Sequence, residues 1–262
     1  MGVFAIGYYL ALFIACQNVN VKKLTSIVLS ISIALVSIGG TIFLTVNDKN
    51  SSKIIVSGAT NMCFSMVVEE KENSMVLSHY SSGSINGYKR VVNKEKIEKV
   101  DNLFLLENSV KDLQVLLTKL NEVKLPEKVY YYGTIEKEEE LAITSSFKGI
   151  ELISVVEEES IKVNKFTFNY TLNGLALNID GENFDVVILG QIPVDMSTNI
   201  KVESSADLVV VKNRSDYILN NCNAINKLTY LKENGYTDAE SNGYVKYVKN
   251  AWFYNIISVA NC

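Results

Sequence analysis

Histidine and cysteine are the side chains best suited to metal or nucleophilic chemistry, and both are scarce in this sequence. The 262 residues include one histidine, His79, and four cysteines. A metal centre that activates water needs several histidine or carboxylate ligands around one open position. A single histidine therefore excludes most histidine-built sites. The cysteines are widely spaced and form no CxxC pair, which argues against a zinc ribbon or a dense disulfide framework. They are Cys16, Cys63, Cys222 and Cys262.

His79 follows an apolar run and precedes the loop-like segment Ser81 to Ser84. We expect His79 to be a turn residue because no partner histidine exists, and a surviving metal ligand or a base is the alternative. The segment Ser81 to Ser84 could cradle a phosphate only if a helix began directly after it. Two acidic runs, Glu136 to Glu140 and Glu157 to Glu159, are typical of a solvated surface, and neither has EF-hand spacing for calcium.

A basic and aromatic cluster lies near the end of the sequence, around Lys246 and Lys249. Such a cluster could contact nucleic acid or a membrane surface. An amphipathic segment docked on a sheet is the alternative interpretation. The formal net charge of -4 gives no global attraction for nucleic acid, so any DNA contact would have to be local. The aromatic members of the cluster are Tyr244, Tyr247, Trp252 and Tyr254.

The stretch from Leu24 to Val46 contains no charged residue. At ~1.5 Å of rise per residue it would span roughly 34 Å as a helix, enough to cross a hydrocarbon core about 30 Å thick. The shorter apolar stretch Met1 to Cys16 has no basic residue before it and no cleavage site after it, unlike a signal peptide. We predict that the two stretches form a transmembrane hairpin. A buried helix of a soluble domain is the alternative for Leu24 to Val46.

The predicted hairpin turns between Asn18 and Lys23. Lys22 and Lys23 in this turn favour the cytoplasmic side, which would place the rest of the chain outside the cell membrane. Lys49 and Lys53 flank the other end of the second helix and nearly balance that count.

From Lys53 onward the pattern changes to short apolar runs typical of strands. A helix is predicted over Ser109 to Val123, where Val110, Leu113, Leu117 and Leu120 recur on one face. A second is predicted over Asn223 to Asn234, closed by Gly235. Gly174 to Gly190 reads as an antiparallel hairpin. Alternating strands and helices indicate a layered α/β sandwich. The expected strands are KIIVSG, CFSMVVE, SMVLSHY, VDNLFLL, KVYYYG, IELISVV, IKVNKFTFNYTL, GLALNID, FDVVILG and ADLVVV.

The order of these segments resembles the C-terminal region of the ComEC family of DNA-internalisation competence proteins. In that family the last membrane helices lead into a metallo-β-lactamase-like domain. The family's DVGQGD strand corresponds to Val56 to Asn61, which keeps Gly58 and loses both aspartates. Its DGG strand end is replaced by Val76 to Ser84, and its HxDxDH motif by the loop Glu107 to Asp112. Gly190 followed by Gln191 stands where the family has TGD, and the HHGS segment has no recognisable counterpart around Lys201 to Ser215.

The resemblance implies two transmembrane helices over residues 1–46, a remnant of the competence channel region. It also implies an αββα metallo-β-lactamase-like sandwich over residues 50–262. Lys111 would place a positive charge among the metal ligands, which opposes a cation. We therefore read Glu107 to Asp112 as an ordinary connection, with Asn108 or Ser109 as N-cap and Asp112 in the first helical turn. The degenerate motif positions are Asn61, His79, Glu107, Ser109, Lys111, Asp112 and Gln191.

We expect a membrane-anchored, catalytically inactive ComEC-like protein of the cell membrane, of bacterial type, without a cofactor. The chain has too few membrane helices to form the family's channel by itself. It would be one part of a split DNA-uptake channel, with a polytopic membrane partner subunit and DNA as partners, or a decayed remnant. Lys246 and Lys249 are the candidate nucleic-acid contacts. The alternatives are a metal-dependent phosphodiesterase or nuclease with an unrecognised site, and a structural envelope interaction protein.

Overall fold

The computed structural model describes residues 32, 36, 52–59, 61–69, 72–106, 112–156, 159–182, 184–190, 206–212, 226–230, 237–238, 243–249 and 254–259. The chain divides into two compact units, Met1–Asn50 and Ser51–Cys262. The predicted membrane hairpin lies outside the described residues except for positions 32 and 36, which are helical. Within the described part of the chain, no helix has both the length and the apolar character needed to cross a bilayer.

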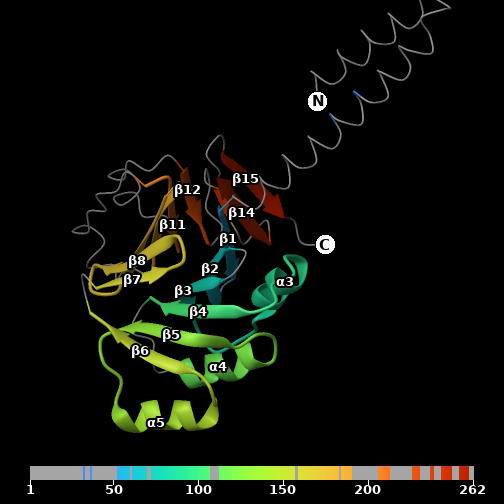
Figure 1. Ribbon diagram of the computed structural model, residues 1–262. Helices are drawn as coiled ribbons and strands as arrows, with labels where there is room; N and C mark the ends of the chain where they lie inside the picture. Colours follow the sequence, from blue (N-terminus) through green and yellow to red (C-terminus); the bar gives the residue numbers. More distant parts are fainter. Residues whose placement is uncertain are drawn as a thin grey trace, which may run out of the picture. The chain divides into compact units, whose positions relative to one another are not determined.

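Two mixed β-sheets make up most of the described part of the second unit (Figure 1). Sheet A has the strand order β15-β14-β1-β2-β3-β4-β5-β6. Strands β3 to β6 are parallel to one another, and β15, β14, β1, β2 and β3 pair antiparallel in turn. The strands are β1 (Ser52–Ala59), β2 (Met62–Val68), β3 (Ser74–Tyr80), β4 (Val100–Leu105), β5 (Pro126–Tyr132), β6 (Glu151–Val155), β14 (Tyr244–Lys249) and β15 (Tyr254–Val259).

Sheet B has the order β13-β12-β11-β10-β9-β8-β7. Its first half is an antiparallel meander, β7 to β10, and its second half, β10 to β13, is parallel. The strands are β7 (Ser160–Val163), β8 (Phe166–Thr171), β9 (Ala176–Gly181), β10 (Phe184–Leu189), β11 (Leu208–Val211), β12 (Asn226–Thr229) and β13 (Thr237–Asp238).

Three helices connect the parallel strands of sheet A: α3 (Asn86–Lys94), α4 (Leu113–Asn121) and α5 (Lys137–Ser146). Parallel neighbours require such crossovers, because a tight turn can join only antiparallel strands. In α4 the apolar residues fall at helical spacing, so one face of the helix is buried. The buried members of α4 are Leu113, Leu116, Leu117 and Leu120.

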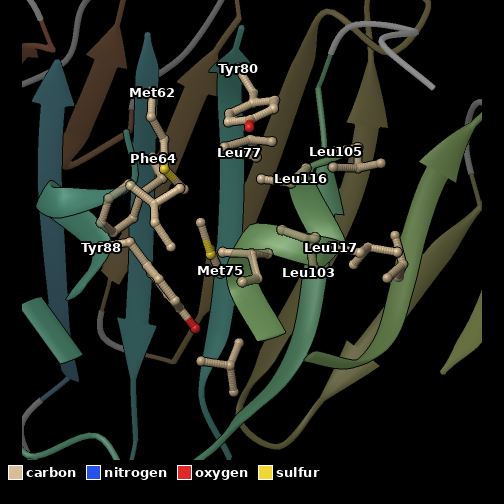
Figure 2. Packing of buried hydrophobic residues seen from close by; sticks show 14 of the residues in the cluster. Met62, Phe64, Met75, Leu77, Tyr80, Tyr88, Leu103, Leu105, Leu116 and Leu117 are labelled. Atoms are coloured by element: carbon tan, nitrogen blue, oxygen red, sulfur yellow. The ribbon is translucent and has the colours of Figure 1, made fainter. Parts of the chain in front are cut away.

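Two hydrophobic cores hold the layers together. The core between the sheets contains Phe104 of β4 stacked on Phe168 of β8, with ring centroids 4.3 Å apart. The core between sheet A and the helices contains Phe64 and Tyr88, which meet edge to face at 5.9 Å (Figure 2). Helices, sheet A and sheet B therefore form a sheet-rich α/β sandwich. This arrangement is consistent with a metallo-β-lactamase-like fold.

The predicted strands are present, except that a turn at Asn164 and Lys165 divides the run IKVNKFTFNYTL into the antiparallel strands β7 and β8. The Gly174 to Gly190 segment forms the antiparallel pair β9 and β10. Helix α4 spans Leu113–Asn121, inside the predicted range Ser109 to Val123, and residues 109–111 of that prediction lie outside the described residues. The predicted helix over Asn223 to Asn234 is wrong for residues 226–229, which form β12. Short apolar runs fit either structure, and here parallel pairing of Leu228 with Val210 of β11 decides for a strand. Helices α3 and α5 were not predicted.

Candidate functional site

The parallel strands of both sheets end at one edge of the sandwich. Leu106, directly after β4, donates its backbone N–H to Leu77 O at 2.9 Å, and Tyr230, directly after β12, donates its own to Val211 O at 2.9 Å. Open α/β sheets bind ligands outside the carboxyl ends of their strands, so this is where a site is expected. We call it the strand-end edge and define it by Tyr80, Leu106, Gly190, Lys212 and Tyr230.

A buried cluster of three hydroxyl groups lies between the sheets at this edge. The Ser78 hydroxyl donates to Tyr230 Oη at 2.9 Å, and Tyr230 Oη lies 2.6 Å from Ser65 Oγ. All three residues are fully buried. Burial raises the pKa of Tyr230 far above its ordinary value, against the opposing effect of the two serine hydrogen bonds. The phenol therefore stays neutral, and the three hydroxyls satisfy one another.

A β-bulge lies at Ser78, the residue of β3 that belongs to this cluster. Strands β2 and β3 pair Cys63 with His79 and then Phe64 with Leu77, so Ser78 has no opposite residue on β2. Bulges change which way side chains point and are frequent near functional sites. Sequence reasoning missed Ser65, Ser78 and Tyr230. The available signal was that a serine interrupts each of the apolar runs CFSMVV and MVLSHY.

Gly58 lets the two sheets approach closely at the same edge. A Cβ atom at Gly58 would lie 1.8 Å from the backbone oxygen of Tyr230. No larger residue fits there without a backbone shift. The glycine that the sequence keeps in the segment Val56 to Asn61 therefore has a packing reason in this chain.

Three of the degenerate motif positions are described: Asn61, His79 and Asp112. Asn61 holds the loop after β3 in place, because its Nδ2 donates to Ser84 O at 3.0 Å and its backbone oxygen accepts from Ser81 N–H at 2.9 Å. His79 is half-buried and lies in strand β3, which continues to Tyr80. The prediction that His79 is a turn residue is therefore wrong. Glu107, Ser109, Lys111 and Gln191 lie outside the described residues.

Asp112 occupies the N-cap position of α4, where its side chain makes no capping hydrogen bond. The sequence instead placed it inside the first turn. Across the described residues, no group of three or more histidine, cysteine, aspartate or glutamate side chains is arranged to hold a metal ion. Lys212, directly after β11, is only 8% exposed.

Helix α3 begins at Asn86, directly after the loop Ser81 to Ser84. The structural condition set for a phosphate cradle is therefore met. The Asn86 N–H donates to Ser84 Oγ at 3.2 Å, and the N-cap residue, Ile85, offers no capping side chain. A helix N-terminus favours an anion. The spacing of Tyr88, Val91 and Val92, which α3 buries, was the signal that could have revealed this helix.

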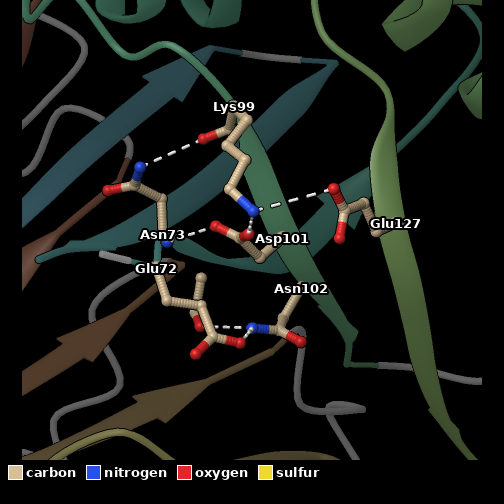
Figure 3. Close-up of polar contacts among 7 residues, drawn as sticks. Glu72, Asn73, Lys99, Asp101, Asn102 and Glu127 are labelled. Carbon is tan, nitrogen blue, oxygen red and sulfur yellow. Dashed lines mark hydrogen bonds and ion pairs between the residues drawn. The ribbon is translucent and has the colours of Figure 1, made fainter. Parts of the chain in front are cut away.

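A second polar network lies at the opposite end of the sheet, where β4 begins (Figure 3). The Asn73 N–H donates to Asp101 Oδ2 at 2.8 Å, and the Asp101 N–H donates back to Asn73 O at 2.9 Å. Lys99 pairs with the other Asp101 oxygen, and Asn102 Nδ2 donates to Glu72 Oε1 at 3.0 Å. These bonds tie the connection before β3 to the start of β4, which is a structural role.

Lys246 and Lys249 lie on opposite faces of β14. Lys246 Nζ is 2.9 Å from Glu95 Oε2 at the end of α3, and the Tyr244 hydroxyl donates to the other Glu95 oxygen at 2.6 Å. Lys249 Nζ is 2.6 Å from Asp207 Oδ2, next to β11 in sheet B. The two lysines therefore do not form one basic patch. Strand β14 lies inside sheet A, between β1 and β15.

No family model matches this chain, and no curated protein matches it either. Among solved structures it is similar to the metallo-β-lactamase fold protein YhfI from Bacillus subtilis, at 15% identity and a TM-score of 0.45 over 68% of this chain and 85% of that one. It is also similar to a diphosphatase from the PhnP family, at 11% identity and a TM-score of 0.42 over 76% of this chain and 98% of that one. Neither structure is a ComEC protein by its description.

Proposed function

We propose that this chain is a membrane-anchored, non-catalytic scaffold protein with a ComEC-like plan. The observation that carries the proposal is the hydroxyl cluster at the strand-end edge. Ser65, Ser78 and Tyr230 bond to one another in the interior, at 2.6 and 2.9 Å. These polar side chains join sheet A to sheet B and bond to one another, not to a ligand.

Ligand supply and packing support the same conclusion. A dinuclear hydrolytic centre needs a ring of neutral imidazoles and carboxylates, and the whole sequence has one histidine. The close approach of Gly58 to the Tyr230 backbone further fills this end of the sandwich.

In the cell, the chain would form one part of a split DNA-uptake channel. The stretches Met1 to Cys16 and Leu24 to Val46 would pack on a polytopic partner, and the sandwich would guide or hold DNA outside the membrane. Deleting the gene in a competent host should then lower transformation. Unchanged transformation, together with no polytopic protein co-purifying with the chain, would leave the structural envelope role instead.

The test of DNA contact uses the double variant and both single variants, because Lys246 and Lys249 face opposite sides of β14. Filter retention of DNA should weaken in the double variant Lys246→Glu with Lys249→Glu. Only one of the two single changes should reproduce that loss, since one face of a strand can meet the DNA. Equal retention by all variants would dispose of these contacts.

The competing function is a metal-dependent phosphodiesterase. An assay separates the scaffold from the phosphodiesterase. A chromogenic phosphodiester is incubated with the full chain and manganese or zinc. The scaffold proposal predicts hydrolysis no faster with the chain than with the metal ion alone. A His79→Ala variant provides the control. If the chain hydrolyses the ester and this variant does not, the protein is an enzyme and the scaffold proposal is wrong.

A further inference from the structure

The edges of the two sheets differ in charge. Among the described strands, β6 and β15 end sheet A, and β7 and β13 end sheet B. Glu151 lies on β6 and Lys162 on β7, while β13 has only two residues, one of them Asp238. Charges and short length are the usual means by which proteins keep an edge from pairing with another chain. Three of these edges therefore carry such protection.

Strand β15, the other edge, has neither the charges nor the short length that protect the other three edges. Its six residues, YNIISV, include no charge, no proline and no glycine. Asn255 and Ile257 are exposed, and Ile257 is a large apolar residue with 40% of its surface open to solvent. Tyrosine, isoleucine and valine all favour strands. The composition of β15 is that of an internal strand rather than a protected edge.

We propose that β15 pairs antiparallel with β15 of a second copy of this chain. This inference is independent of the proposed function. Like charges directly opposite each other destabilise a pair of strands. Self-pairing of β15 creates no such conflict, because the strand is uncharged. Self-pairing of β7 about Lys162, by contrast, would oppose two ammonium groups. The charge pattern therefore selects β15 for contact between copies.

The faces of the strand fix the register. Ile256 lies opposite Tyr247 and packs against the core between the sheets, whereas Ile257 lies opposite Lys246 on the face toward the helices. A two-fold axis perpendicular to the sheet keeps each face on its own side, so residues of one face must pair with that same face. An axis through Ile257 places this side chain beside its own copy and covers its exposed surface.

The first test is the oligomeric state of the full chain in detergent, by sedimentation. The wild-type chain should be a dimer at tens of micromolar, and Ile257→Lys should be a monomer, because two added ammonium groups would meet at the axis. Val115→Lys is the matched control, since Val115 on α4 is 43% exposed, and this variant should remain a dimer. A monomeric wild-type chain, or a dimer that survives Ile257→Lys, overturns the proposal.

The second test reads the register directly and does not depend on weakening the dimer. Opposite residues in an antiparallel pair have Cβ atoms about 4.5 to 5.5 Å apart, close to disulfide range. Under mild oxidation, Ile257→Cys should give a disulfide-linked dimer on a denaturing gel, and reducing agent should convert it to monomer. The wild-type chain and Val115→Cys should give much less. Equal crosslinking in all three would contradict an axis at this residue.

Discussion

The Ser78 hydroxyl of sheet A donates a 2.9 Å hydrogen bond to the hydroxyl of Tyr230, which follows β12 in sheet B. This bond joins the sheets at the edge where their parallel strands end. It also uses up polar groups that could otherwise have faced a ligand.

Tyr230→Phe should destabilise the fold. The change removes the shared partner of Ser65 and Ser78 and leaves two buried hydroxyls without it. An unsatisfied buried polar group costs about 1–3 kcal/mol. Urea unfolding should show a lower midpoint with an unchanged slope. Thr118→Ala, at an exposed position on α4, should stay within about 0.5 kcal/mol of wild type. If the two changes lower the unfolding midpoint equally, the hydroxyl cluster does not stabilise the fold.

Gly58→Ala should be more damaging than its single added methyl group suggests. The new Cβ would start 1.8 Å from the Tyr230 oxygen, so the strands must move apart. Overpacking of this kind costs about 1–3 kcal/mol. Gly87→Ala in α3 is the comparison, because the nearest atom to its Cβ would be the side-chain oxygen of Ser57 at 3.2 Å, a tight contact that a shift of a few tenths of an ångström relieves, and alanine favours a helix. Thermal unfolding should separate the two variants, and equal melting temperatures would refute the close approach.

Glu69→Gln should change how stability depends on pH. Burial raises the pKa of Glu69 above 4.5, the Glu72 carboxylate adds to this, and Asn164 and Lys165 oppose it. The folded state therefore holds this proton more tightly than the unfolded state does. The resulting stabilisation is complete below about pH 4.5 and is lost as pH rises through the higher folded-state pKa. As the pH rises from about 4.5 through the folded-state pKa, the stability of Glu69→Gln relative to wild type should therefore increase. Parallel stability curves would show that Glu69 does not contribute.

The sequence predicted β1 to β6 and β9 to β11 because each is an apolar run bounded by polar or glycine residues. Strand β3 was predicted with the bounds that the structure shows, Ser74–Tyr80. Where a run is short, the local signal fails, as at Asn226–Thr229. That segment is a strand only because β11 lies beside it, and pairing between distant segments cannot be read from periodicity.

The candidate site was harder to predict than the fold. The sequence drew attention to His79 and the loop after it, but not to Tyr230, which lies more than a hundred residues away from its partner Ser78. The bulge at Ser78 also has no local signature in the sequence. Lys246 and Lys249 are close in the sequence, yet an odd spacing puts them on opposite faces once the segment is a strand.

Metal content tests the central claim most directly. The full chain should be expressed with zinc and manganese in the medium, purified without chelator, dialysed and analysed by mass spectrometry for bound metal. Our account predicts far less than one equivalent of either metal per chain, with Tyr230→Phe giving the same value. One or two tightly held ions per chain, lost in the His79→Ala variant, would contradict it.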